Sequence, residues 1–282
     1  MALNKNALGK EYPPQEYKIT AEETKKYAYG YNEASLVFLD ETRPQGIISP
    51  PMFGVKYGGS CFAQAFFDPD LNVDFTRLVH GEQDMSFLAP VRPGDTITSV
   101  GKIASIEEKS TGEIFVVEVT SRNQNGESVL KMSGTFFIRG AKSGSDKKKE
   151  AEEAPSKKYI CTQSMPVKEN QTYIYAEGSG DHNPIHVNPD FAKSVGLPGI
   201  ILQGLCTMAF CFKAIQDECC KGDPLKIRRL RVRFAKPVLP LDTVTTRGWL
   251  EEKREGITAV GLEAVNQKGD IVLRNGLAEI AV

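Results

Sequence analysis

The sequence predicts an α+β fold in which two antiparallel sheets each wrap around one buried helix. Three observations predict it: an internal repeat over the 282 residues, a charged segment that separates the two copies, and an apolar helix followed by hairpin-linked strands. A doubly wound fold would instead alternate strands with helices along the chain, and this sequence does not.

Two pairs of matching segments carry the repeat. Residues 87–96, FLAPVRPGDT, match residues 234–243, FAKPVLPLDT, at an offset of 147 (234 − 87). Residues 123–126, NQNG, match residues 266–269, NQKG, at an offset of 143 (266 − 123). The difference of four residues corresponds to one shortened loop, so the chain contains the same unit twice.

The segment between the copies is strongly hydrophilic. Residues 141–158, AKSGSDKKKEAEEAPSKK, contain no large apolar side chain and are dense in charge. Such a segment cannot bury enough apolar surface to order itself. We therefore predict a front domain over residues 1–140, a linker over 141–158 and a back domain over 159–282.

Composition excludes several classes of partner. The chain has 35 basic and 36 acidic residues, so its net charge of −1 gives no reason to expect nucleic acid or a membrane surface. No apolar run approaches the ~18 residues of a membrane span, and neither a secretory signal nor an SKL-type peroxisomal signal is present. The six cysteines lack zinc-ligand spacing, so we expect reduced thiols, no metal and a cytoplasmic location.

The back copy shows the elements in order. Apolar residues at helical spacing between Ile201 and Ile215 predict a helix buried on nearly all sides. Strands are expected over residues 227–234, 243–252, 257–266 and 271–282. The last two are joined by a turn at Gln267–Asp270 whose Gly and Asp are typical of hairpins.

The loop before this helix, GSGDHNPIH over residues 178–186, is expected to be a turn too rich in Gly and Pro to be helical. Asp181 and His186 can converge there, hold one water between two acceptors and exchange a proton with it. The alternative is structural: Asp181, Ser179 and Asn183 satisfy the amides of the turn. A metal site of Asp181 and two histidines is disfavoured, because no further ligand follows.

Gly204 stands near the start of the buried helix. Its amide is expected to be one of the unpaired donors at the positive end of the helix dipole, which suits an oxyanion hole. The alternative is that Gly204 only permits close packing of helix on sheet.

The front copy lacks the acid/base pair. Aligning Tyr27 with Tyr175, at an offset of 148 (175 − 27), places Glu33 opposite Asp181 and Phe38 opposite His186. The front copy is therefore predicted to bind and not to react.

These residues resemble a known family. The segment from Gly178 to His186 matches the hydratase motif of the MaoC-like hydratases at every fixed position. Residues 201–207, ILQGLCT, and 233–237, RFAKP, are similar to the hydratase 2 portion of peroxisomal multifunctional enzymes, and residues 79–83, VHGEQ, to its N-terminal partner. The resemblance covers nearly the whole chain and implies a double hot-dog fold.

The resemblance also implies an activity, the reversible hydration of a trans-2-enoyl-CoA to the (3R)-3-hydroxyacyl-CoA in fatty-acid metabolism. No cofactor is implied; the partner is the acyl-CoA substrate, and a homodimer fits the family. The catalytic residues it implies are Asp181, His186, Asn183 and Gly204, and the substrate contacts it implies are His80, Gly81, Lys109, His182, Pro184, Ile185 and Phe234.

One position departs from the family pattern, because Gln203 replaces the usual His before Gly204. Gln can donate a hydrogen bond but cannot titrate, so the resemblance does not extend to the tuning of the oxyanion site by a histidine at this position. Two other functions stay open: a dehydratase of another 3-hydroxyacyl thioester, carrier-bound or a short branched CoA, and a non-catalytic acyl-thioester binding module. Neither the acyl-chain length nor the oligomeric state follows from the sequence.

Overall fold

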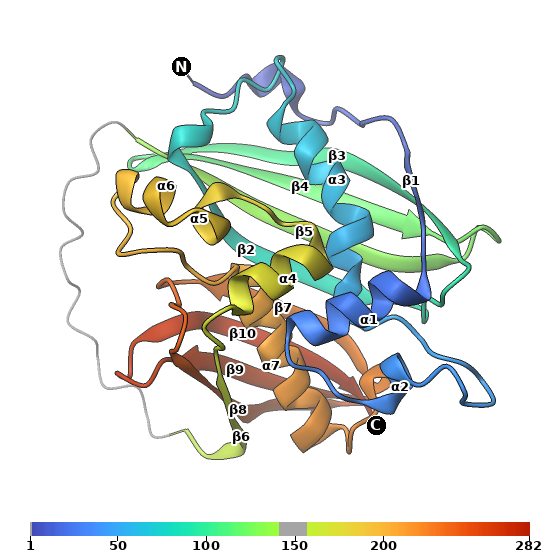
Figure 1. The fold of residues 1–282 in the computed structure, drawn as a ribbon. Coiled ribbons are helices and arrows are strands. Elements are labelled where there is room, and N and C mark those ends of the chain that lie inside the picture. Colours follow the sequence, from blue (N-terminus) through green and yellow to red (C-terminus); the bar gives the residue numbers. More distant parts are fainter. Residues whose placement is uncertain (1, 141–156) are drawn as a thin grey trace.

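The computed structural model describes residues 2–140 and 157–282, so all but the last two residues of the expected linker lie outside it. One antiparallel sheet of ten strands runs through both copies, in the order β1-β3-β4-β5-β2-β7-β10-β9-β8-β6. Figure 1 shows α3 lying across the front half of this sheet and α7 across the back half. The two expected sheets are thus present as half-sheets joined edge to edge, each with its own helix.

The elements of the front copy are β1 (Gln15–Lys18), α1 (Ala21–Gly30), α2 (Leu36–Leu39), α3 (Gly54–Phe66), β2 (Leu78–Phe87), β3 (Thr96–Lys109), β4 (Gly112–Arg122) and β5 (Ser128–Arg139). Those of the back copy are β6 (Tyr159–Pro166), α4 (Gln171–Ser179), α5 (Pro184–Val187), α6 (Pro189–Ser194), α7 (Gly204–Cys219), β7 (Ile227–Phe234), β8 (Thr243–Arg254), β9 (Ile257–Val265) and β10 (Ile271–Ala281). Short 3-10 turns lie at Lys5–Ala7, Pro51–Phe53, Phe75–Arg77 and Pro224–Lys226.

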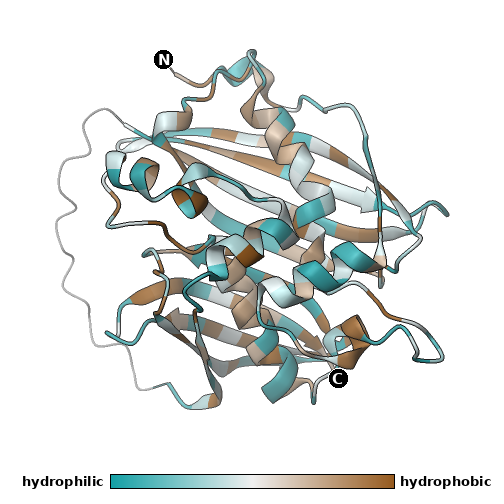
Figure 2. Ribbon diagram, viewed as in Figure 1, coloured by the Kyte–Doolittle hydropathy of each residue, from teal (hydrophilic) through white to brown (hydrophobic). Residues whose placement is uncertain are grey.

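Helix α7 is buried over most of its length, as its sequence predicts. In Figure 2 its upper turns are apolar, whereas α1, at the surface, carries long hydrophilic stretches. The helix begins at Gly204 and not at Ile201. The amides of Ile201 and Leu202 donate to the carbonyls of Ile185 and Val238, so these residues lie outside the helix. They are apolar because they pack beneath the loop, and this burial extends the helical periodicity beyond the helix.

The stretch expected to be a non-helical turn is partly helical. Helix α4 continues to Ser179 and ends at Gly180, whose φ of +80° is the left-handed conformation that glycine adopts readily. Helix α5 then begins at Pro184 itself. Proline interrupts a helix interior but suits its first position, where the missing N–H has no intrahelical partner. Asp181 lies between the two helices, so it and His186 are not neighbours on one helix, as predicted.

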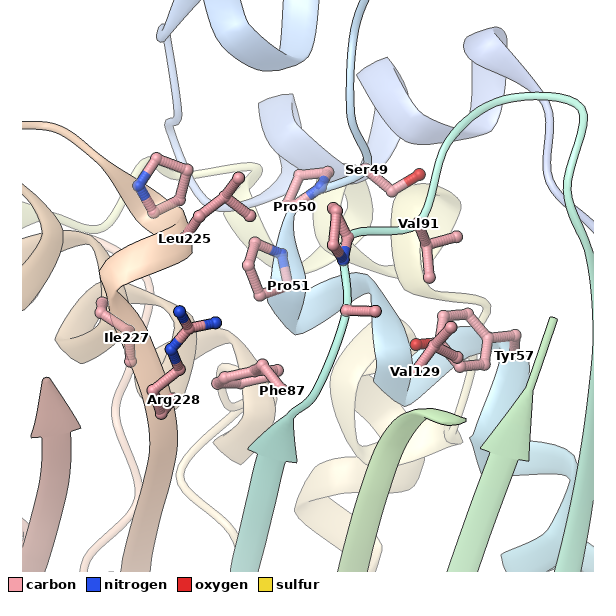
Figure 3. Close-up of a pocket in the computed structure, with 13 residues that line it drawn as sticks. Ser49, Pro50, Pro51, Tyr57, Phe87, Val91, Val129, Leu225, Ile227 and Arg228 are labelled. Atoms are coloured by element: carbon pink, nitrogen blue, oxygen red, sulfur yellow. The ribbon is translucent and has the colours of Figure 1, made fainter. Parts of the chain in front are cut away.

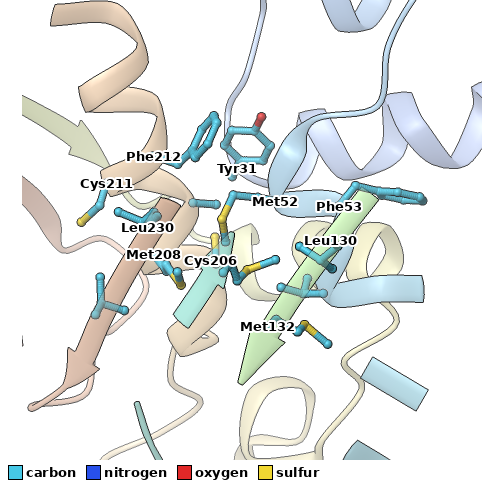
Figure 4. Close-up of a cluster of buried hydrophobic side chains, with 14 of the residues drawn as sticks. Tyr31, Met52, Phe53, Leu130, Met132, Cys206, Met208, Cys211, Phe212 and Leu230 are labelled. Atoms are coloured by element: carbon cyan, nitrogen blue, oxygen red, sulfur yellow. The ribbon is translucent and has the colours of Figure 1, made fainter. Parts of the chain in front are cut away.

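The two copies meet along the antiparallel pair β2–β7, in which Asp84 lies opposite Arg231. Across the same pair of strands, the guanidinium of Arg229 donates to both carboxylate oxygens of Asp84, at 2.8 and 2.6 Å. Above the sheet α1 packs on α4, and the hydroxyls of Tyr27 and Tyr175 lie 3.2 Å apart. The apolar core continues across this junction, where residues such as Met52 and Leu130 face Cys206 and Phe212 (Figure 4).

Close contact between α1 and α4 depends on Gly178. A Cβ there would lie 2.7 Å from the carbonyl oxygen of Lys26 and 2.9 Å from the Cα of Tyr27, both backbone atoms that cannot step aside. We therefore expect Gly178→Ala to lower the free energy of unfolding by about 1–3 kcal/mol in denaturant titrations.

The control is Gly59→Ala in α3, because a Cβ at Gly59 meets no atom within 4 Å. There the better helix propensity of alanine should raise stability by about 0.5–1 kcal/mol. Equal effects of the two substitutions would contradict this account of the helix contact.

Candidate active site

A cavity of about 870 Å³ lies between the two copies, at the end of the β2–β7 seam where β7 finishes. The back copy contributes the loop from Ser179 to His186, the start of α7 and the end of β7. The front copy contributes one face of α3, the start of β2 and the end of β5. A substrate in this cavity would therefore touch both copies.

His186 is 7% exposed, and a backbone carbonyl fixes the orientation of its ring. Its Nδ1 lies 2.7 Å from the carbonyl oxygen of Ile201, which can only accept, so Nδ1 carries the proton in the neutral ring. Nε2 then presents a free lone pair, 3.8 Å from Oδ2 of Asp181. Two acceptors at this spacing do not bond each other but can both accept from one water molecule.

The Asp181 carboxylate is fixed by the backbone of Asn183. The amide of Asn183 donates to Oδ1 of Asp181 at 3.2 Å, and Oδ1 of Asn183 caps α5 by accepting from the amide of Ile185 at 3.3 Å. Oδ2 of Asp181 therefore stays available toward His186. Some turn amides are thus satisfied by these side chains, as the structural alternative expects, yet Asp181, Asn183 and His186 also line the cavity.

Gln203 does not reach the cavity. It is fully buried, and its Nε2 donates to the carbonyls of Thr172, at 3.0 Å, and Asp181, at 3.3 Å. It therefore ties the Asp181 loop to α4, so its contacts are with the backbone of the loop and not with an oxyanion site.

Gly204 is the first residue of α7 and lines the cavity. Its amide has no backbone acceptor within the described ranges, as expected for a first helical residue. A Cβ at Gly204 would lie 2.9 Å from two ring carbons of Phe234, so only glycine allows this ring to pack on the helix start. The two roles proposed for this residue from the sequence are therefore compatible.

His80 enters the cavity from the front copy. The register of β2 against β5 shifts between His80 and Glu82, which makes Gly81 the extra residue of a bulge. Nε2 of His80 lies 3.1 Å from the carbonyl of Glu82, and its ring centroid is 5.0 Å from that of Phe234. Burial lowers the pKa of His80 to about 4, so the ring is neutral at pH 7 and forms part of an aromatic wall.

The structure does not bring every expected residue together. Ile185 and Phe234 line the cavity, whereas Gly81, Lys109, His182 and Pro184 do not. Lys109 lies at the β3–β4 hairpin, 2.5 Å from a carboxylate oxygen of Glu107. Arg139, at the end of β5, does line the cavity and has no carboxylate partner within the described part of the chain. No motif marks Arg139 in the sequence, because its position depends on the pairing of β5 with β2.

The loop of the front copy that aligns with the Asp181 loop packs against the rest of the protein. Glu33, aligned with Asp181, is 2% exposed and accepts from the amides of Ala34 and Ser35 and from Lys213 of α7 at 3.3 Å. Phe38, aligned with His186, is fully buried in a small apolar cluster. The expected loss of acid/base chemistry is thus accompanied by a fastening of the front loop onto the back helix.

Two further features are absent from residues 2–140 and 157–282. In this part of the chain no three His, Cys, Asp or Glu side chains are grouped as metal ligands. Nor does any helix there have the length and apolarity to cross a bilayer.

Comparisons with known proteins show which families the two copies are similar to. Residues 150–268 match the MaoC like domain, and residues 6–132 match the FAS1-like dehydratase domain region. The chain is 27% identical over 291 residues to "Probable enoyl-CoA hydratase 2" of Dictyostelium discoideum, covering 98% of this chain and 96% of that protein. A crystal structure of a MaoC-like dehydratase from Phytophthora capsici has a TM-score of 0.81 at 24% identity, covering 100% of this chain and 98% of that one.

A third relative is longer. Peroxisomal multifunctional enzyme type 2 of Drosophila melanogaster is 30% identical over 201 residues, which covers 69% of this chain and 33% of that protein. The chain therefore spans about a third of the length of this relative.

Fold, cavity and relatives together define an enzyme of the hydratase/dehydratase class. The chain has a MaoC-like domain in its back half and a FAS1-like dehydratase region in its front half. The family resemblance and the double hot-dog fold predicted from the sequence are confirmed, and the non-catalytic alternative is not supported.

The Glu33–Lys213 contact yields a prediction on stability. Burial lowers the pKa of Lys213, but hydrogen bonds and charges from Asp217 and Glu33 outweigh burial and raise it above its ordinary value. Lys213→Met leaves the Glu33 carboxylate buried without its cation, so the free energy of unfolding should fall by about 3 kcal/mol.

Chemical denaturation measures this change. The double variant Glu33→Gln/Lys213→Met removes both charges and should recover most of the loss, and Lys168→Met, at an exposed lysine, serves as the control. A single variant as stable as the wild type would show that the pair does not fasten the copies.

Proposed function

We propose that the chain reversibly hydrates trans-2-enoyl-CoA to (3R)-3-hydroxyacyl-CoA. The observation that carries the proposal is the pair of acceptors, Nε2 of His186 and Oδ2 of Asp181, 3.8 Å apart beside the unpaired amide of Gly204. Names of relatives that include enoyl-CoA hydratase 2 support the same substrate class.

In the proposed reaction one water donates a hydrogen bond to each acceptor. Its oxygen attacks C3 while Nε2 of His186 takes a proton, and the C2=C3 electron pair moves toward the thioester carbonyl. The imidazolium is stabilised by Asp181 on one side and by the Ile201 carbonyl on the other. The proton is then returned to C2 from the same face, which completes the addition of one water with no cofactor.

Gly204 serves the developing negative charge in this proposal. An enolate oxygen near the first turn of α7 would accept from the Gly204 amide and lie at the positive end of the helix dipole. Such a donor stabilises the transition state more than the neutral thioester, so it accelerates the step and does not merely tighten binding. Asn183 acts through Asp181, whose carboxylate it orients.

The two copies have different roles in the proposed reaction. We place the chemistry in residues 159–282 and much of the substrate wall in residues 1–140, where α3 offers apolar side chains such as Val55 and Phe62 to an acyl chain. Both walls come from one chain, so one chain suffices for one site, and a homodimer would contain two. We keep the cytoplasm as the proposed compartment, with the free cysteines as support.

The direct test mixes the purified protein with crotonyl-CoA and with trans-2-decenoyl-CoA, and follows the loss of enoyl absorbance. Chiral analysis of the product should give the R hydroxyacyl-CoA. If neither substrate is consumed, enoyl-CoA is the wrong substrate, and 3-hydroxyacyl thioesters on a carrier protein become the next class to assay.

Substitution of the acceptors gives a sharper expectation. Asp181→Asn and His186→Ala should each lower kcat by at least about a hundredfold, because each removes a positioned acid/base group. His182→Ala is the matched control, since His182 is exposed beside them and does not line the cavity. Full rates in Asp181→Asn and His186→Ala would refute the assignment of the site.

The proposed contact with a CoA phosphate is tested by substituting two basic residues, Arg139 and Lys109. We propose that Arg139, which lines the cavity and has no carboxylate partner among the described residues, meets a CoA phosphate. Arg139→Ala should then raise KM about tenfold with little change in kcat, a loss on the scale of a charged hydrogen bond. Lys109→Ala should change KM little, since Lys109 pairs with Glu107. The opposite result would favour Lys109, the contact that the family resemblance implies.

A further inference from the structure

A second cavity, of about 160 Å³, lies at the opposite end of the β2–β7 seam, where β2 finishes and β7 begins. Figure 3 shows it between the start of α3, the end of β2 and the segment around Leu225. Its volume is less than a fifth of that of the larger cavity, so it has room for a ligand of a few heavy atoms and not for an acyl-CoA.

The second cavity is the duplicate of the first. Residues that line it match, at the offsets of the internal repeat, residues that line the larger cavity: Phe87 with Phe234, Val129 with Val272, and Ile227 with His80. The acid/base chemistry is missing, because Glu33 and Phe38 are committed to packing. The amide of Gly54, the counterpart of Gly204, already donates to the carbonyls of Met52 and Pro51. The cavity has thus kept its walls and lost its reactive groups.

Two polar groups face this cavity without partners. Tyr57 is 4% exposed, and its hydroxyl makes no hydrogen bond within the described ranges. Burial raises the pKa of Tyr57, so the hydroxyl keeps its proton and is a donor. Arg228 is exposed at the rim and has no carboxylate partner in the same ranges. Figure 3 shows both groups directed toward the middle of the cavity from opposite sides.

These features specify the chemistry of a ligand. Among the described residues no Asp or Glu lines the cavity, and Arg228, the one cation among them that lines it, is at the rim, so an anion is favoured there. Between the two polar groups the lining is apolar, including Pro51, Phe87 and Val129. The Tyr57 hydroxyl has no acceptor among the described residues, so a ligand oxygen that reaches it would accept its hydrogen bond.

We propose that this cavity binds a short-chain carboxylate that carries a hydroxyl or keto oxygen further along its carbon chain. The carboxylate accepts from Arg228 at the rim, the carbon chain packs against Phe87 and Val129, and the second oxygen accepts from the Tyr57 hydroxyl. The site is separate from the Asp181–His186 cavity, and the proposal does not depend on the reaction catalysed there.

The test titrates the methyl-labelled protein with 3-hydroxybutyrate and with butyrate, observed by NMR. Methyl groups of Val129 and Ile227 report on this cavity, and those of Val272 and Ile201 report on the larger one. We expect saturable shifts at Val129 and Ile227, with 3-hydroxybutyrate bound about fivefold more tightly than butyrate, the worth of one neutral hydrogen bond.

Variants separate the two contacts. Arg228→Gln should weaken both ligands at least about tenfold, because it removes the cation that holds the carboxylate. Tyr57→Phe, which keeps the ring, should make the two ligands bind equally, and His186→Ala should change neither affinity. Absence of saturable shifts at Val129 and Ile227, shifts confined to Val272 and Ile201, equal binding of both ligands by the wild type, or no effect of Arg228→Gln would each overturn the proposal.

Discussion

The pairing of β2 with β7 is the constraint on which the rest of the molecule depends. Asp84 and Arg231 are equivalent residues of the repeat, at an offset of 147 (231 − 84), and they lie directly opposite each other. Tyr27 and Tyr175 are equivalent too, and their hydroxyls meet above the sheet. Matching residues touch in this way only near a two-fold axis. The strand pair therefore builds a pseudo-symmetric molecule with one cavity at each end of its seam.

The two ends of the β2–β7 pair nevertheless differ in their side chains and hydrogen bonds. At one end the Gly204 amide has no acceptor among the described residues, and Nε2 of His186 presents a lone pair; at the other end the Gly54 amide donates within a tight turn. Glu33, where the repeat would place Asp181, is bound by Lys213 of the other copy. The proposed acid/base pair at one end and the Glu33–Lys213 contact between the copies thus come from equivalent positions with different partners.

Much of the fold could be predicted because it rests on local and periodic signals. The repeat, the apolar pattern of α7 and the hairpin signal at Gln267–Asp270 each depend on short stretches of sequence. The start of α7 was predicted three residues too early, because Ile201 is apolar for tertiary reasons. The short helix at Pro184 was missed because proline can begin a helix as well as end one.

The site was predictable where a compact motif carries it, and not where strand pairing creates it. Asp181 and His186 lie five residues apart and converge through local turns. Arg139 is more than forty residues from either of them, and only the joined sheet places it at the same cavity. Gln203 shows the same limit: its position was visible in the sequence, but its two backbone acceptors were not.

The Glu33–Lys213 contact has a consequence for how such a molecule can diverge. In a dimer of identical subunits a substitution alters both sites at once, so an acid that fastens one loop would replace the acid that reacts in the other. Here the two copies share a single chain, and each can be inherited with its own sequence. Joining the two copies in one chain thereby releases each end of the β2–β7 pair from the requirements of the other, so one end can use its acid to fasten the junction while its cavity takes a different shape.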